Sequence, residues 1–91
     1  DGAPPLSGEL ARQWQQTMTR AYEELIESLR HHEKPWLDPY GATEPAEFFA
    51  VLTETFFQRP RHLKAEQPEV HDALVGFFRF DPVNLHEHRA D

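Results

Sequence analysis

One apolar stripe in the first third of the chain constrains the fold more than any other feature. Between Ser7 and about Arg30, apolar residues recur at spacings of three and four: Leu10, Trp14, Met18, Ala21, Leu25 and Leu29. This spacing places them on one side of an α-helix. Ser7 suits the N-cap, and Glu9 lies in the first turn, where the helix dipole favours negative charge. At 1.5 Å per residue the helix would be roughly 35 Å long, so we expect it to extend past its own core.

Prolines divide the middle of the chain into a loop and a second helix. Pro35 and Pro39 interrupt any helix in the segment HHEKPWLDPYGA, which we expect to form a structured loop. Thr43 is predicted to be the N-cap of the next helix, with Pro45 in the first turn, where a missing backbone N–H costs nothing. This second helix should end at about Arg59, before the following proline.

Two shorter helices are predicted to follow. The stretch RHLKAEQ favours a short helix, and Pro68 begins a last one, PEVHDALVGFFRF, which Asp81-Pro82 should end. No segment alternates apolar and polar residues with a period of two. We therefore predict an all-α fold of three to four helices, with one domain over residues 1–82 and a mobile tail over residues 83–91.

The composition excludes several classes of protein and site. A formal net charge of −7 argues against nucleic acid and against an anionic membrane surface as partners, because this surface would repel both. The absence of cysteine excludes disulfides and thiolate metal sites. No apolar run approaches the roughly 20 residues of a membrane span. The 91 residues form one small domain, and a start at Asp1 rather than Met predicts a piece of a longer protein.

The six histidines do not form a recognisable zinc motif. HExxH places two histidines four residues apart on one side of a helix, with a glutamate beside the first, and this motif is absent. The histidines of the loop and of the tail are expected to be exposed: His31, His32, His86 and His88. His62 and His71 are predicted to lie at the surface or at the boundary of their helices. No glycine-rich phosphate loop and no GxSxG motif is present.

Glu47 directly precedes Phe48 and Phe49 in the packed part of the second predicted helix. Helical spacing groups Glu47 with Ala50 and Glu54 on a polar side. The spacing alone therefore favours a solvated carboxylate, and the alternative is a carboxylate held inward by a group that needs its charge. Four phenylalanines are predicted to belong to the core or to meet another part of the protein: Phe48, Phe49, Phe56 and Phe57.

The run YGATEPAEFFAVLTETFFQRP, followed by HLKAEQPEVHDALVGFFRFDP and preceded by DGAPPL, is more specific than any spacing. Together these stretches resemble the C-terminal half of the Mlc titration factor A family of zinc-dependent peptidases, from Asp1 to about Pro82. The run from Tyr40 to Ala50 also resembles the metallopeptidase domain of anthrax lethal factor. The resemblance implies the C-terminal part of a larger, gluzincin-like metallopeptidase domain in a cytoplasmic protein that hydrolyses peptide bonds through a metal-activated water.

The resemblance also implies roles for individual residues. In the family, the HExxH helix supplies two histidine ligands and the general base, and a downstream helix supplies a glutamate as the third ligand, which Glu47 matches. Tyr40 matches the active-site tyrosine, whose hydroxyl can donate to the oxyanion of the tetrahedral intermediate. The alternative for Tyr40 is a packing role at the end of a loop. Glu54 either reaches groups behind the metal ligands or is solvated.

The HExxH motif of the family should lie upstream of DGAPPL and is not in this chain. The resemblance therefore implies zinc and a peptide substrate for the intact parent, whose N-terminal half is the missing partner. It implies no bound metal and no activity for this chain alone. The alternative is a non-catalytic helical module that binds a transcriptional repressor, as the family's namesake is reported to do. Apolar surface left uncovered would favour self-association.

Overall fold

The computed structural model describes residues 8–84, which form four α-helices and one short 3-10 helix. The elements are α1 (Gly8–Arg30), η1 (Pro39–Ala42), α2 (Pro45–Gln58), α3 (Pro60–Glu66) and α4 (Pro68–Phe78). No strand occurs between residues 8 and 84, and the predicted all-α fold is confirmed. Across this range, none of the helices combines the length and the apolar character that crossing a bilayer requires.

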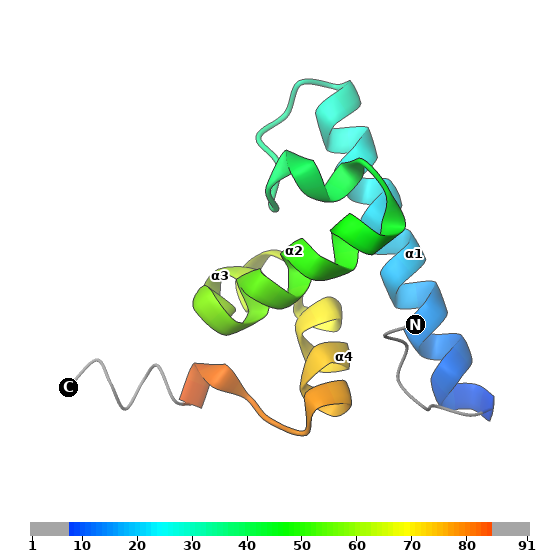
Figure 1. The fold of residues 1–91 in the computed structure, drawn as a ribbon, viewed down its shortest axis with the longest axis vertical. Helices are drawn as coiled ribbons and strands as arrows, with labels where there is room; N and C mark the ends of the chain where they lie inside the picture. The colour runs from blue at the N-terminus through cyan, green and yellow to red at the C-terminus, as the bar shows by residue number, and fades with distance from the viewer. Residues whose placement is uncertain (1–7, 85–91) are drawn as a thin grey trace.

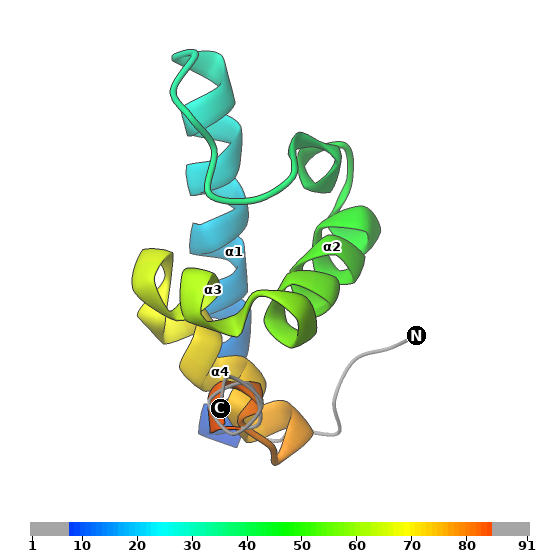
Figure 2. The ribbon, with the colours of Figure 1, turned by 90° about the vertical axis from the view of Figure 1, so that its left-hand side faces the viewer.

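The other elements pack around α1, which runs along one side of the molecule (Figure 1). η1 approaches the C-terminal half of α1 at Leu25. α4 approaches the N-terminal half, where the ring centroids of Trp14 and Phe77 are 5.3 Å apart. The loop after α1 turns back along this helix before it reaches η1 (Figure 2). This return places η1 and the start of α2 beside the middle of the chain's longest helix.

The core lies where the four α-helices meet. Its side chains with 0% exposure come from every α-helix: Ala21, Leu25, Leu52, Phe56, Leu63, Val70 and Leu74. Trp36 and Leu37 of the returning loop join them and are 8% and 5% exposed. Each large apolar side chain buried in this way contributes roughly 1.5–3 kcal/mol. The loop is therefore part of the core and not a surface connection.

α1 spans the predicted range, although Ser7, its predicted N-cap, lies outside the described residues. Ala21 and Leu25 in the stripe are fully covered, whereas Leu10 remains 62% exposed. The predicted helix is confirmed, and it extends beyond the core that it covers, as its length indicated.

α2 begins at Pro45 with Glu44 as its N-cap, and no side chain caps it. The predicted N-cap at Thr43 is wrong. The Thr43 hydroxyl donates to the carbonyl oxygen of Tyr40 at 2.8 Å, so it closes η1 instead. Pro45 has no N–H to be capped, and its fixed φ suits a first helical position. η1 itself lies within the segment that the prolines predict to be a loop.

His71 lies in the core, which corrects the prediction of a surface or boundary position. Its side chain is 1% exposed, and its ring centroid is 5.5 Å from that of Phe56. Leu74 and Phe78 follow it by three and seven residues, on the same side of α4. Helical spacing could therefore have indicated its burial. His62 is half-buried, as predicted, and its Nε2 is 2.9 Å from the carbonyl oxygen of Trp36.

The chain changes direction after α4 earlier than predicted. α4 ends at Phe78, and Arg79 adopts a left-handed conformation with φ 59°, as residues that follow a helix C-terminus often do. Pro82 is fully buried and Val83 is 7% exposed. Residues 85–91 of the predicted tail, including His86 and His88, lie outside the described residues. His31 and His32 are exposed, as predicted.

Candidate functional site at Tyr40 and Glu47

η1 carries Tyr40 and is held by hydrogen bonds at both of its ends. The Asp38 side chain accepts from the backbone N–H of Tyr40 at 2.9 Å, and the Asp38 carbonyl accepts from Gly41 at 2.9 Å. At the other end, Thr43 donates to the Tyr40 carbonyl from its hydroxyl at 2.8 Å and from its backbone N–H at 3.2 Å. The N–H and the C=O of Tyr40 are therefore both bonded within this segment.

Gly41 lets η1 approach the core closely. It is buried, and a Cβ at this position would lie 3.1 Å from a Leu37 methyl and 3.6 Å from a Leu25 methyl. The Tyr22 hydroxyl of α1 adds a contact of 3.4 Å to the carbonyl oxygen of Ala42. The backbone on the C-terminal side of Tyr40 is thus fixed against α1, while the Tyr40 side chain is 55% exposed.

Glu47 lies in the first turn of α2, where the helix dipole favours a carboxylate. Phe48 points inward, is 4% exposed and packs edge to face on Tyr22. Phe49 is half-buried and lies edge to face with Trp14. These two rings fix the rotation of α2. Glu47 is therefore half-buried at the edge of the packed face, next to an exposed side that carries Ala50, Glu54 and Gln58.

The structure brings Tyr40 and Glu47 together. A hydrogen bond with the Glu47 carboxylate, together with its negative charge, raises the pKa of the Tyr40 hydroxyl above its ordinary value of 10.0. A neighbouring anion disfavours the phenolate. The hydroxyl is protonated at neutral pH even at its ordinary pKa, so it is able to donate a hydrogen bond there. Helical spacing gave no indication of this contact, which depends on how η1 and α2 meet. Only the family resemblance pointed to these two positions.

The described residues supply one suitable metal ligand here and not a complete site. A glutamate carboxylate is a common zinc ligand in sites that also hold two imidazoles. Within residues 8–84, no group of three or more His, Asp or Glu side chains is arranged to hold a metal ion. Glu47 therefore fits the predicted role in its donor chemistry, and any further ligands would have to come from outside these residues.

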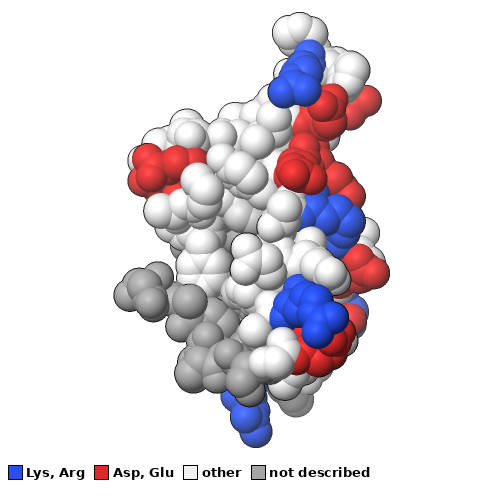
Figure 3. Space-filling model, turned by 90° about the vertical axis from the view of Figure 1, so that its right-hand side faces the viewer, with Lys and Arg blue, Asp and Glu red and all other residues white. Residues whose placement is uncertain are grey.

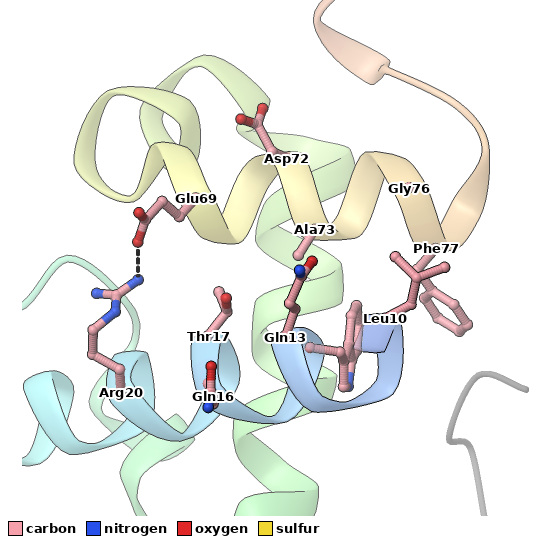
Figure 4. A pocket seen from close by; sticks show the side chains of 11 residues that line it. Leu10, Gln13, Gln16, Thr17, Arg20, Glu69, Asp72, Ala73, Gly76 and Phe77 are labelled. Carbon is pink, nitrogen blue, oxygen red and sulfur yellow. Dashed lines mark hydrogen bonds and ion pairs between the residues drawn. The ribbon is translucent and has the colours of Figure 1, made fainter. Parts of the chain in front are cut away.

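A groove of about 770 Å³ lies between α1 and α4. Leu10 and Phe77 lie at one end of it, and Arg20 and Glu69 form an ion pair of 2.8 Å at the other (Figure 4). Neither Tyr40 nor Glu47 lines this groove. Elsewhere on the molecule, one face carries acidic and basic side chains interspersed in a strip, beside a broad area with few charged side chains (Figure 3).

A second groove, of about 740 Å³, borders the candidate site. It runs between the returning loop and α2, and its lining includes Asp38, Pro39, Glu54 and His62. Glu54 is exposed on this side of α2. The groove thus reaches the residue that caps η1 without including Tyr40 or Glu47 among its lining residues.

Comparison with known proteins places the chain in a class of metallopeptidases. It matches the family model described as glucose-regulated metallo-peptidase M90 over residues 1–79 and belongs to this family. No solved structure matches the chain.

Individual relatives agree with this family. The chain is 38% identical to Mlc titration factor A of Edwardsiella ictaluri over 84 residues, which are 90% of this chain and 32% of the relative. It is 32% identical to Mlc titration factor A of Yersinia pestis over 85 residues, 91% of this chain and 32% of the relative. An uncharacterized protein of Synechocystis is 35% identical over 72 residues, 79% of this chain and 26% of the relative.

The resemblance to the Mlc titration factor A family is therefore confirmed. The chain spans about a third or less of the length of these relatives. The resemblance of the run from Tyr40 to Ala50 to anthrax lethal factor stays a prediction.

Proposed function

We propose that this chain is the C-terminal helical part of a zinc-dependent metallopeptidase that hydrolyses peptide bonds, with Glu47 as its metal ligand and Tyr40 as its oxyanion donor. The observation that carries the proposal is the contact between the Tyr40 hydroxyl and the Glu47 carboxylate, formed by two different elements. Membership of the M90 family supports the metal chemistry. The resemblance favours the cytoplasm as the compartment.

The two residues would have separate tasks. Bound zinc would supply a Lewis acid that lowers the pKa of water, which makes hydroxide available near neutral pH. Glu47 would hold the metal from a helix whose rotation Phe48 and Phe49 fix. Tyr40 would be protonated near neutral pH, because the ordinary pKa of its hydroxyl is already 10.0, and would donate a hydrogen bond to the oxyanion that forms on the substrate carbonyl.

The test requires the remaining part of the domain. We would replace the matched region of the Edwardsiella relative with this chain and measure zinc content and peptide hydrolysis. Glu47→Gln should lower both. Tyr40→Phe should retain zinc and lower kcat by about 10²–10³-fold, which is typical for the loss of one oxyanion donor.

Glu54→Gln provides the matched control, because Glu54 is an exposed carboxylate on the same helix. It should retain zinc, and its activity should change much less than that of Glu47→Gln. Full zinc content together with full activity in Glu47→Gln would rule out the proposed ligand.

A second candidate function is a non-catalytic helical module that binds a transcriptional repressor. The groove between α1 and α4 favours it, since Leu10 leaves apolar surface exposed there. Several relatives are named Mlc titration factor A, and we propose Mlc as the partner to test. Titration of the isolated chain with purified Mlc should then show binding that Leu10→Gln weakens and Glu47→Gln leaves unchanged. Loss of binding in Glu47→Gln, or no binding at all, would exclude this role.

A further inference from the structure

We infer that Asp38 and Thr43 are positioning residues that hold the Tyr40 side chain beside Glu47. This inference rests on the proposed function of Tyr40 and Glu47. Both residues are exposed and lie outside the α-helices, and together they would set the direction in which the Tyr40 side chain points. Neither residue would touch substrate or metal; each would act through the backbone of Tyr40.

η1 cannot hold its shape by itself. It contains four residues, and 3-10 turns of this length have poor hydrogen-bond geometry and depend on their surroundings. Tyr40 is its second residue, and its side chain is 55% exposed. Packing of the phenol ring therefore does little to fix its direction, which the backbone of η1 must set.

Two side chains bond the backbone of Tyr40 from opposite ends. The Asp38 carboxylate accepts the N–H of Tyr40 at 2.9 Å, and the Thr43 hydroxyl donates to its C=O at 2.8 Å. Buried Gly41 holds the next residue against Leu37 and Leu25. Because the phenol oxygen stands at the far end of the side chain, a small rotation of this backbone would move it away from Glu47.

Asp38 and Thr43 hold η1, and they have no role in the core or as a cap of α2. Both are exposed, so neither contributes to the core. Thr43 does not cap α2, because Glu44 occupies the N-cap position. Within the described part of the chain, the hydrogen bonds of the Asp38 carboxylate and of the Thr43 hydroxyl go to Tyr40. Their geometric effect is therefore concentrated on this one residue.

The test measures the position of Tyr40 in the isolated chain by NMR, through nuclear Overhauser contacts between its ring and the Glu47 side chain. Asp38→Ala removes one acceptor and Thr43→Val removes one donor. Each should weaken these contacts by about half or more, while the core resonances stay dispersed. Asp38→Asn and Thr43→Ser keep the bonding atoms and should restore the contacts.

Two matched controls remove the same kinds of bond elsewhere. Asp81 accepts the N–H of Val83 at 3.0 Å, with the same spacing as Asp38 and Tyr40. Thr55 donates its hydroxyl to the carbonyl oxygen of Val51 at 2.9 Å within α2. Asp81→Ala also removes a carboxylate 3.4 Å from Nε2 of the buried His71, so Thr55→Val is the cleaner control. Both variants should leave the contacts between Tyr40 and Glu47 unchanged.

The outcomes separate the inference from the proposed function. If Asp38→Ala unfolds the chain, Thr43→Val decides, because it retains the backbone bond from Thr43 to Tyr40. Unchanged contacts in Thr43→Val would overturn the inference. In the chimeric enzyme, Thr43→Val should lower kcat by about tenfold with KM and zinc content nearly unchanged. A different result is that the variants weaken the contacts between Tyr40 and Glu47 while the chimera shows no metal-dependent hydrolysis. That result would support the positioning role of Asp38 and Thr43 and would reject the proposed peptidase function.

Discussion

The Tyr40 hydroxyl lies beside the Glu47 carboxylate, although the two side chains come from different elements, η1 and the first turn of α2. Hydrogen bonding to this carboxylate favours the neutral phenol, and the negative charge of Glu47 disfavours the phenolate. Both effects raise the pKa of Tyr40. The contact links the two residues that the family resemblance singled out.

Glu47→Gln is expected to lower the pKa of Tyr40 toward its ordinary value of 10.0, because the substitution removes the negative charge that opposes ionisation. Tyr22→Phe makes Tyr40 the only tyrosine, so the ultraviolet absorbance of the phenolate then reports on Tyr40 alone. In the Tyr22→Phe background, Glu54→Gln should leave the pKa of Tyr40 unchanged. An unchanged titration after Glu47→Gln would show that the two groups do not interact.

A hydrogen bond between Gln67 and Glu24 connects the junction of α3 and α4 to α1. The Gln67 amide donates to the Glu24 carboxylate at 2.9 Å, and this bond, with Arg20 beside it, lowers the pKa of Glu24 below its usual 4.5. A lowered folded-state pKa contributes stability that is present above 4.5 and is lost as the pH falls through the folded value. The chain should therefore lose stability in acid partly through Glu24.

Gln67→Leu should lower the free energy of unfolding at neutral pH by about 1 kcal/mol. This is less than is usual for a hydrogen bond to a charged group, because Glu24 is 46% exposed and solvent screens its charge. Urea unfolding at neutral and acidic pH measures the loss, which should shrink once Glu24 is protonated. Gln13→Leu is the control, since Gln13 bonds Glu9 at 3.2 Å on the exposed surface. Equal losses for the two variants would contradict this account.

Phe56 and Phe57 are neighbouring phenylalanines of α2 that differ in burial, so substitutions of the two test where the core lies. Phe56 is 0% exposed and Phe57 is 38% exposed. Phe56→Ala should cost about 3–5 kcal/mol, enough to unfold a domain of this size at moderate temperature, because it leaves a cavity. Phe57→Ala should cost clearly less, since part of its ring already meets water. Circular dichroism during thermal unfolding would compare them, and equal effects would refute this placement of the core.

Leu10 should promote self-association of the isolated chain, because its side chain is 62% exposed beside the groove between α1 and α4. Sedimentation should show a dimer or a larger species at high concentration, and Leu10→Gln should shift it toward monomer. Gln15→Ala changes an exposed residue of α1 outside the groove and should have no such effect. A monomer at every concentration would contradict the prediction.

Local signals made most of the fold predictable. The stripe from Leu10 to Leu29 defined α1, Pro60 marked the boundary between α2 and α3, and Pro68 marked the start of α4, because periodicity and proline sterics act within one or two helical turns. Thr43 shows where such signals fail. A threonine before a helix suits an N-cap, but a nearby carbonyl of η1 takes its hydroxyl instead. η1 was not predicted, although Asp38 before Pro39 is a local cap signal. Its close approach to α1 depends on tertiary contacts.

The sequence by itself determined which segments are helical and which family the chain resembles. Only the tertiary structure decided that the loop after α1 folds back into the core, that the His71 ring faces Phe56, and that Tyr40 meets Glu47. The physical reason is distance along the chain. Helical periodicity reports contacts between residues three or four apart, whereas the position of η1 also depends on its packing against Leu25, which lies on another helix.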